Sequence, residues 1–145
     1  MTIADRMQDY IAQNAVAWDT LPRLVHVPAE RVAKAIALKD AGGYVVAVIP
    51  GTAQLDVPRL RQALGRDLAL ADDRDLARLF PDCLPGAVPP LATVYGVPTL
   101  WATSLGDAPD IYFEGGDQHT LVHMFGMEFR ELMRTARALP PRTYH

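Results

Sequence analysis

The chain has 145 residues, half of them apolar, and a formal charge of −3 from 17 acidic and 14 basic side chains. A single domain over residues 1–145 with a sizeable core is predicted, whereas coating of long nucleic-acid duplexes by charge alone is excluded. The sequence has no long apolar run, its N-terminal segment is charged, and it contains a single cysteine. These features predict a cytoplasmic protein without a membrane span or an internal disulfide.

The first half of the sequence predicts a helix, a hairpin and a second helix. Two apolar strands flank the turn "DAGG" and are therefore expected to pair with each other. The second helix has an N-cap residue in Asp56, a proline in its first turn and a terminating glycine in Gly65. In chain order we expect a helix to about residue 14, an extended segment over 16–21, strands over 31–40 and 44–51, and, within residues 52–65, a helix that begins after Asp56 and ends at Gly65.

The second half predicts shorter elements around an irregular segment. Residues 81–98 contain five prolines and two glycines, which forbid regular secondary structure but can fix a rigid loop. Hairpins outnumber strand–helix–strand crossovers along the chain, so the fold class is a mixed α/β domain. The expected elements are a short strand over 67–71, a short helix over 72–80, strands over 99–105, 110–116 and 118–125, and a closing helix over 126–139.

Lys34 occupies an unusual position in the first strand of the hairpin. Side chains alternate along a strand, so Lys34 shares a face with the larger apolar residues Ile36 and Leu38. Its stem can lie along these neighbours while the amine reaches solvent, which is the commoner arrangement. Alternatively, the strand lines a pocket in which the amine meets a phosphate or a developing oxyanion. Lys39, beside the turn, is expected to be solvated.

The proline-rich loop provides a second candidate group. Gly86 permits close backbone approach or a positive φ, and the prolines around it restrict the neighbouring torsions. The amides of Gly86, Ala87 and Val88 are therefore candidates for rigid, unpaired donors, which suit a tetrahedral oxyanion. An ordinary proline-rich connection is the alternative.

Other chemistries have weaker signals in the sequence. Cys83 has no histidine at a diagnostic spacing, and a cysteine of this kind is more often a small buried residue. His119 and His123 are four residues apart, but they fall in an expected strand without a supporting carboxylate or cysteine, so we expect no metal site. The acidic residues of 72–75 are interpreted as a solvated helix N-terminus that the helix dipole stabilises.

Several motifs together resemble the YbaK/EbsC family over about residues 29–133. They are the lysine strand "VAKAIALKD", the loop "FPDCLPGAVPP", the segment "IYFEGGDQHTLVHM" and the closing helix. Members are free-standing aminoacyl-tRNA deacylases, similar to the editing insertion of bacterial prolyl-tRNA synthetase. The resemblance implies a mostly antiparallel, curved sheet with flanking helices and a trans-editing hydrolase without metal or cofactor. It also implies that the protein binds the acceptor end of aminoacyl-tRNA and that prolyl-tRNA synthetase is a possible partner.

The resemblance implies roles for individual residues. The family's essential lysine corresponds to Lys34, which would contact the phosphate region of the terminal adenosine or the ester. The family's Gly-x-x-x-Pro loop corresponds to residues 86–90, whose amides would face the ester. Water, assisted by the ribose hydroxyl, is the implied nucleophile, or the substrate's own thiol in cysteine-specific members. The further positions implied to bind substrate are Pro89, Pro90, Gly115, Gly116 and His119.

One segment is shorter than in the family. Members carry a helix over the pocket between the first strand and the lysine strand, whereas only "PRLVHVPAERVA" separates Leu21 from Lys34 here. The implied loss of roughly a dozen residues predicts a wider pocket. It also leaves a non-catalytic binding module as an alternative function, and a homodimer that covers the exposed apolar surface as a hypothesis.

The substrate expected from the resemblance is tRNA(Pro) charged with alanine, cysteine or another small residue. A synthetase rejects a smaller analogue poorly, because a missing methylene is worth only about 1–3 kcal/mol. Four arginines are candidate contacts for acceptor-stem phosphates, although single arginines are more often plain surface charge. These are Arg23, Arg31, Arg59 and Arg61.

Overall fold

The computed structural model describes residues 4–14, 16–22, 26–84, 87–117 and 120–145. Within these ranges, none of the helices combines the length and the apolarity needed to cross a bilayer. The helices are α1 (Asp5–Gln13), α2 (Val57–Leu64), α3 (Asp73–Leu79) and α4 (Gly126–Leu132), with 3-10 helices η1 (Ala29–Arg31), η2 (Ala92–Tyr95) and η3 (Thr103–Asp107). The strands are β1 (Asp19–Pro22), β2 (Ala33–Asp40), β3 (Gly43–Pro50), β4 (Ala69–Leu70), β5 (Thr99–Trp101), β6 (Asp110–Glu114), β7 (Thr120–Phe125) and β8 (Arg137–Ala138).

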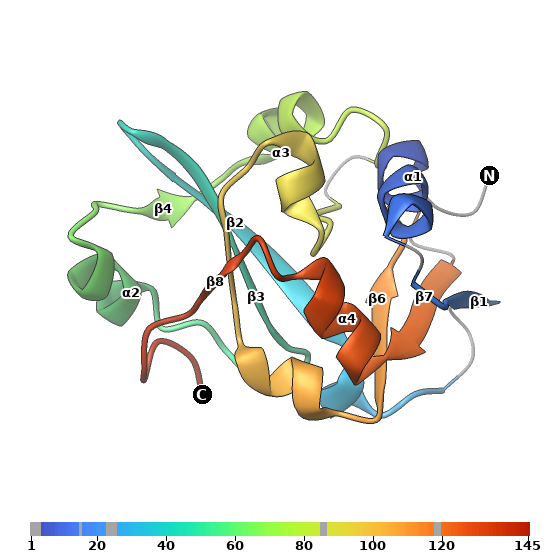
Figure 1. Cartoon of the computed structure of the whole chain (residues 1–145). Coiled ribbons are helices and arrows are strands. Elements are labelled where there is room, and N and C mark those ends of the chain that lie inside the picture. The colour runs from blue at the N-terminus through green and yellow to red at the C-terminus, as the bar shows by residue number, and fades with distance from the viewer. Residues whose placement is uncertain (1–3, 15, 23–25, 85–86, 118–119) are drawn as a thin grey trace.

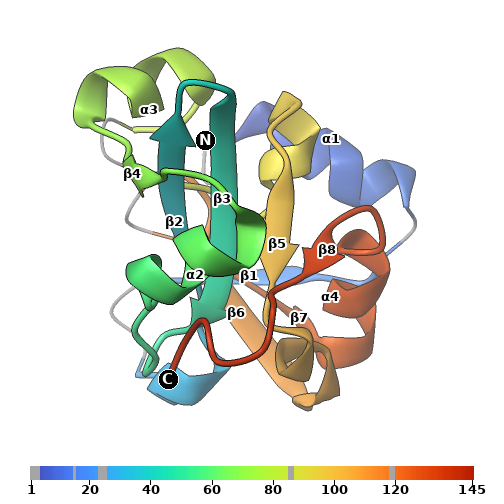
Figure 2. The same cartoon turned by 90° about the vertical axis from the view of Figure 1, so that its left-hand side faces the viewer.

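A five-stranded sheet of order β4-β2-β3-β5-β8 forms the middle of the molecule (Figure 1). The pairs β3–β5 and β5–β8 are parallel, and the other pairs are antiparallel. Helix α2 lies on one side of this sheet, as Figure 2 shows, and α1, α4 and the antiparallel three-stranded sheet β1-β7-β6 lie on the other. This mixed, mostly antiparallel architecture with flanking helices confirms the predicted fold class.

The β2–β3 hairpin is formed as the sequence predicts. Its register runs from Ala33 opposite Pro50 to Asp40 opposite Gly43. Gly43 has a φ of +128°, a backbone conformation that favours glycine at the turn. Residues 45–49 of β3 are all at most 3% exposed, because both faces of this strand are covered. The uninterrupted apolar run of β3 therefore reflects its central position in the sheet.

The predicted caps of α2 are confirmed. The carboxylate of Asp56 accepts a hydrogen bond of 3.1 Å from the Arg59 amide, and a proline occupies the first turn. Gly65 ends the helix in the left-handed conformation with a φ of +63°. These three local signals fix where the helix begins and where it ends.

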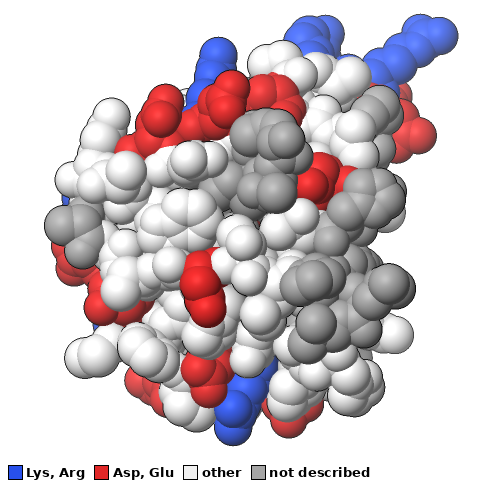
Figure 3. Space-filling view, turned by 90° about the vertical axis from the view of Figure 1, so that its right-hand side faces the viewer, with Lys and Arg blue, Asp and Glu red and all other residues white. Residues whose placement is uncertain are grey.

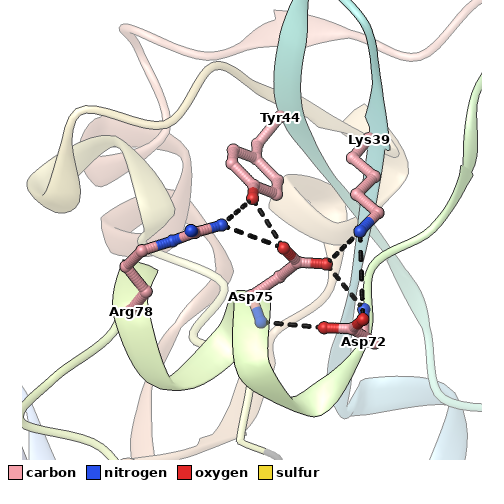
Figure 4. A network of polar contacts seen from close by, with 5 residues as sticks. All are labelled: Lys39, Tyr44, Asp72, Asp75 and Arg78. Carbon is pink, nitrogen blue, oxygen red and sulfur yellow. Dashed lines mark hydrogen bonds and ion pairs between the residues drawn. The ribbon is translucent and has the colours of Figure 1, made fainter.

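Helix α3 joins the hairpin through a network of charged side chains (Figure 4). The prediction of a solvated acidic segment is wrong for Asp75, whose side chain is only 7% exposed. Lys39, also expected to be solvated, lies with its Nζ 2.7 Å from the Asp75 carboxylate, and the Tyr44 hydroxyl donates to the same carboxylate over 2.6 Å. The hydrogen bonds from Lys39 and then Tyr44 hold the pKa of Asp75 well below its usual range.

The end of the chain differs from the prediction of one long helix over 126–139. Helix α4 ends at Leu132, and Arg137–Ala138 pair in parallel with Leu100–Trp101 of β5. Leu139 continues this pairing by donating its amide proton to the Trp101 carbonyl over 2.9 Å. Since β5 would otherwise present unpaired backbone groups at the edge of the sheet, tertiary pairing overrides the helical spacing of this segment.

Two further predicted boundaries are wrong. Residues 92–95 form η2 inside the segment expected to be irregular, because no proline falls between Leu91 and Val97. Gly96, with a φ of +75°, ends this turn. The strand expected over 99–105 ends at Trp101, and the chain then turns through η3, whose Leu105 is 2% exposed and packs in the core.

The core is one buried cluster that reaches both sheets. Phe129 of α4 lies with its ring centroid 5.9 Å from that of Trp101 on β5 and 5.8 Å from that of Phe113 on β6. Helix α4 therefore packs between the two sheets, and its largest side chain bridges them. This packing sets the separation of β2 from β6, where the candidate site is found.

Candidate functional site

A cavity of about 580 Å³ lies between the two sheets at the beginning of β2. Its described lining comes from segments far apart in the sequence: residues before and within β2 from His26 to Ala35, Gly51 after β3, three residues of the proline-rich loop, Glu114 at the end of β6 and Leu121 near the start of β7. The cavity thus brings together the lysine strand and the loop that the sequence analysis selected separately.

Lys34 lines this cavity and is half-buried. Its Nζ donates a hydrogen bond of 2.7 Å to the carbonyl oxygen of Ala53. An ammonium group carries three protons, so this contact fixes the orientation of the amine and leaves donors for a ligand. Lys34 therefore borders the cavity with its amine bound to a backbone carbonyl, and its role in binding or catalysis stays a prediction.

The loop segment contributes Ala87, Val88 and Pro90 to the cavity wall, whereas Gly86 lies outside the described residues. The expectation that the loop amides are unpaired is wrong for Ala87, because its amide donates to the Leu84 carbonyl over 3.0 Å. The Val88 amide has no acceptor within the described part of the chain. Pro89 is buried but is not among the described lining residues.

The glycine turn after β6 supports the site from outside. Gly115 and Gly116 are buried, but neither is among the described residues that line the cavity. Their carbonyls accept hydrogen bonds of 2.7 Å from the amides of Ala4 and Leu84, respectively. Gly116 has a φ of +102°, and an added Cβ would lie 3.1 Å from the Cys83 sulfur. The turn therefore anchors the entry to the loop, while His119, also predicted here, lies outside the described residues.

Glu114, at the end of β6, lines the cavity and was not selected from the sequence. Val32 and Tyr112 form an isolated parallel bridge between the beginning of the lysine strand and β6. The two strands therefore approach each other at this point, and Lys34 of β2 and Glu114 of β6 both line the cavity. The alternation in "IYFEGG" is the signal that would have identified this acid, since Ile111 and Phe113 are fully buried.

The shortened segment before β2 forms part of the wall. His26, Val27 and Ala29 line the cavity, and residues 29–31 form the single turn η1. The amide of Gly51 donates to the Val32 carbonyl over 2.8 Å, which holds this turn against the end of the hairpin. A short turn thus stands where the related family is expected to carry a longer helix.

The arginines considered for phosphate contacts are engaged within the chain. Arg31 pairs with Asp110 at 3.4 Å, Arg59 pairs with Asp56 at 3.3 Å, and Arg61 donates to the Leu68 carbonyl. Arg23 lies outside the described residues. Figure 3 shows a face on which uncharged side chains predominate and acidic groups are scattered, with Lys and Arg at its margins. The three described arginines are therefore each bound to a group of the chain itself.

His123 lies on the three-stranded sheet, outside the cavity lining. Its ring nitrogens are 2.5 Å from the Asp19 carboxylate and 2.8 Å from the Asp110 carboxylate. Burial opposes the charged imidazole, but the hydrogen bonds with Asp110 and Asp19 outweigh it and raise the pKa of His123. Among the described residues, no group of three or more His, Cys, Asp or Glu side chains is arranged to hold a metal ion.

Cys83 is half-buried beside Tyr95, with the thiol sulfur 3.6 Å from the Tyr95 hydroxyl. Burial raises the pKa of the Cys83 thiol, and burial together with the hydrogen bond to Asp82 raises the pKa of Tyr95. A thiol with a raised pKa is a poor nucleophile at neutral pH. This arrangement favours the reading of Cys83 as a packed residue.

Comparison with known proteins identifies one family. The chain matches the family model described as the aminoacyl-tRNA editing domain over residues 12–132, in agreement with the resemblance noted in the sequence. No curated protein sequence matches the chain.

Solved structures share the fold. A proposed signal transduction protein from Marinobacter aquaeolei VT8 has a TM-score of 0.79 and 22% identity; the match covers 92% of this chain but only 29% of that chain. A proposed trans-editing enzyme for prolyl-tRNA synthetase has a TM-score of 0.76 and 19% identity, with 93% of each chain covered. Similarity at these identities establishes the fold.

Proposed function

Because this chain belongs to the aminoacyl-tRNA editing domain family, we propose that it hydrolyses the ester bond of a mischarged aminoacyl-tRNA in trans. The observation that supports this most is the meeting of Lys34 with Ala87 and Val88 around one cavity of about 580 Å³. A cavity of this size is typical of sites for small ligands. An aminoacylated terminal adenosine is such a ligand.

In the proposed reaction, Lys34 supplies positive charge to the phosphate region of the terminal adenosine or to the ester. Its hydrogen bond to the Ala53 carbonyl holds the amine in one orientation before substrate binds, which lowers the reorganisation needed in the transition state. The Val88 amide is the described loop donor that is left for the developing oxyanion, since the Ala87 amide is engaged by Leu84. Water, assisted by a ribose hydroxyl of the substrate, attacks the ester carbonyl.

The proposed substrate is tRNA(Pro) carrying alanine, cysteine or another small residue. A proline site cannot strongly reject smaller side chains, so prolyl-tRNA synthetase is the proposed source of the mischarged tRNA. A second site that admits the smaller residue restores fidelity.

A non-catalytic binding module with the same cavity is the second candidate. The short segment before β2 favours it, because the turn at residues 29–31 replaces a longer covering helix and exposes more of a bound ester to bulk water. This module would bind the acceptor end of aminoacyl-tRNA, or a protein partner, without turnover.

Deacylation of tRNA(Pro) charged separately with alanine, cysteine, serine and proline distinguishes the two candidates. We expect the wild type to hydrolyse at least one non-cognate ester and Lys34→Met to lose about 100-fold to 1,000-fold in rate, the usual cost of removing one electrostatic stabiliser. Methionine keeps the apolar stem and removes the charge.

Lys39→Met is the matched control, because it removes the other lysine of the chain at a position outside the cavity lining. Its rate should stay within about threefold of the wild type under conditions where both variants are folded. Absence of hydrolysis by the wild type with every ester would refute the hydrolase and favour the binding module.

A further inference from the structure

The cavity contains an anionic side chain as well as the cationic one. Glu114 of β6 and Lys34 of β2 both line it, and these two strands approach each other at the Val32–Tyr112 bridge. The Lys34 amine is oriented by the carbonyl of Ala53 at 2.7 Å. The two charged residues thus lie on strands that belong to different sheets and border the same cavity.

An aminoacyl ester at the end of a nucleic acid has a matching distribution of charge. Its phosphates are anionic, and its α-amino group is largely protonated below a pKa of about 8. A carboxylate in a partly enclosed site binds an ammonium group through charge-assisted hydrogen bonds, which are stronger than neutral ones. A single lysine accounts for the anionic end of such a ligand and leaves the cationic end without a partner.

We propose that Glu114 binds the α-ammonium group of the aminoacyl moiety and thereby makes the site selective for free aminoacyl esters over N-blocked or deaminated ones. This inference rests on the function proposed above. Glu114 already has an interaction within the chain. A carboxylate has about four acceptor sites, so it can accept a ligand's ammonium group in addition to that interaction.

A binding experiment with two stable ligands tests this assignment. The first ligand is 3′-deoxy-3′-(L-alanylamino)adenosine, in which an amide replaces the ester; the second is the 3′-lactylamino compound, which has a hydroxyl in place of the α-ammonium group. At pH 6.5 we expect the wild type to bind the alanyl ligand about 10-fold to 100-fold more tightly than the lactyl ligand, as measured by calorimetry. The preference should fall above about pH 8, as the amine loses its proton.

Glu114→Gln keeps the size of the side chain and removes its charge. This variant should bind both ligands with the affinity of the wild type for the lactyl ligand, at either pH. Glu128→Gln, on α4 and outside the cavity lining, removes the same charge elsewhere and should keep the wild-type preference. If Glu114 has a purely structural role, Glu114→Gln should weaken the binding of both ligands by the same factor, and this result would overturn the proposal.

The remaining outcomes separate this inference from the hydrolase itself. A preference that persists in Glu114→Gln, or a wild type that binds neither ligand or shows no preference, overturns the role of Glu114. Deacylation of charged tRNA by the wild type is measured in parallel and reports on the hydrolase independently. Selective binding without turnover supports the Glu114 assignment and contradicts hydrolysis. Turnover without selective binding supports hydrolysis and contradicts the Glu114 assignment.

Discussion

Gly51→Ala should deform the candidate site without altering any of its polar groups. A Cβ added to Gly51 would lie 2.6 Å from the Ala29 carbonyl oxygen and 3.3 Å from the Cβ of Val32. Ordinary contact begins near 3.4 Å, so η1 must move outward by about 0.8 Å. The contact is with backbone, which cannot rotate away as the end of a side chain can. Overpacking of this kind costs about 1–3 kcal/mol.

The expected stability loss corresponds to a fall in melting temperature of roughly 2–12 °C for a chain of this size. Because Ala29 and Val32 line the cavity, the Michaelis constant for the charged tRNA, or the dissociation constant for the alanyl ligand, should rise as well. Thermal unfolding and ligand titration measure the two effects in the same preparation.

Gly42→Ala is the control for this prediction, since its added Cβ would meet the Asp40 carboxylate oxygen at 3.3 Å, only about 0.1 Å inside ordinary contact, at the opposite end of the hairpin. This variant should leave the ligand affinity unchanged, and it should change the free energy of unfolding by no more than about 1 kcal/mol. If Gly51→Ala melts and binds as the wild type does, η1 does not pack against the hairpin end as described.

Two pH effects on stability also follow from the structure. The hydrogen bond from Arg66 lowers the pKa of Asp40 to about 2. Asp40 therefore stabilises the fold above its unfolded pKa of about 4, and this contribution is lost as the pH falls toward 2. Asp40→Asn should have a lower melting temperature than the wild type at pH 5, and its melting temperature should fall less than that of the wild type on acidification. The carboxylates of Asp110 and Asp19 raise the pKa of His123, so this residue stabilises the fold below pH 6.5 and the contribution is lost as the pH rises through its folded pKa. His123→Gln should therefore lower the melting temperature at pH 6 more than at pH 9, and an equal fall at both values would contradict the charged state of the imidazole.

The elements that local chemistry determines were predictable from the sequence. Asp56 and Gly65 carry their own capping signals, and the run before "DAGG" alternates as a strand does. These signals act within a few residues, so they are visible without knowledge of the fold. Lys34 was selected from side-chain alternation and the loop from its prolines and glycine, and the structure brings both to one cavity. The family resemblance added their roles in catalysis, which stay predictions.

The features that the sequence analysis missed depend on partners distant in the chain. Arg137–Ala138 have helical spacing but form a strand because β5 lies beside them. The Ala87 amide donates a hydrogen bond to the Leu84 carbonyl, and no residue type in the loop predicts that contact from the sequence. Glu114 lines the cavity because β6 approaches the beginning of β2 at the bridge between Val32 and Tyr112, a pairing of segments 80 residues apart in the sequence. Tertiary pairing of this kind leaves only a weak local signal.

The edge of the five-stranded sheet formed by β5 and β8 has a consequence for the solution behaviour of the protein. Strand β5 contains three residues and β8 contains two, so this edge of the sheet offers few free backbone donors and acceptors to another chain. Long, flat edges act as templates on which further copies add strand by strand, and short edges do not. Residues 137 and 138, which pair with β5 instead of extending α4, thus protect this edge of the sheet against edge-to-edge aggregation.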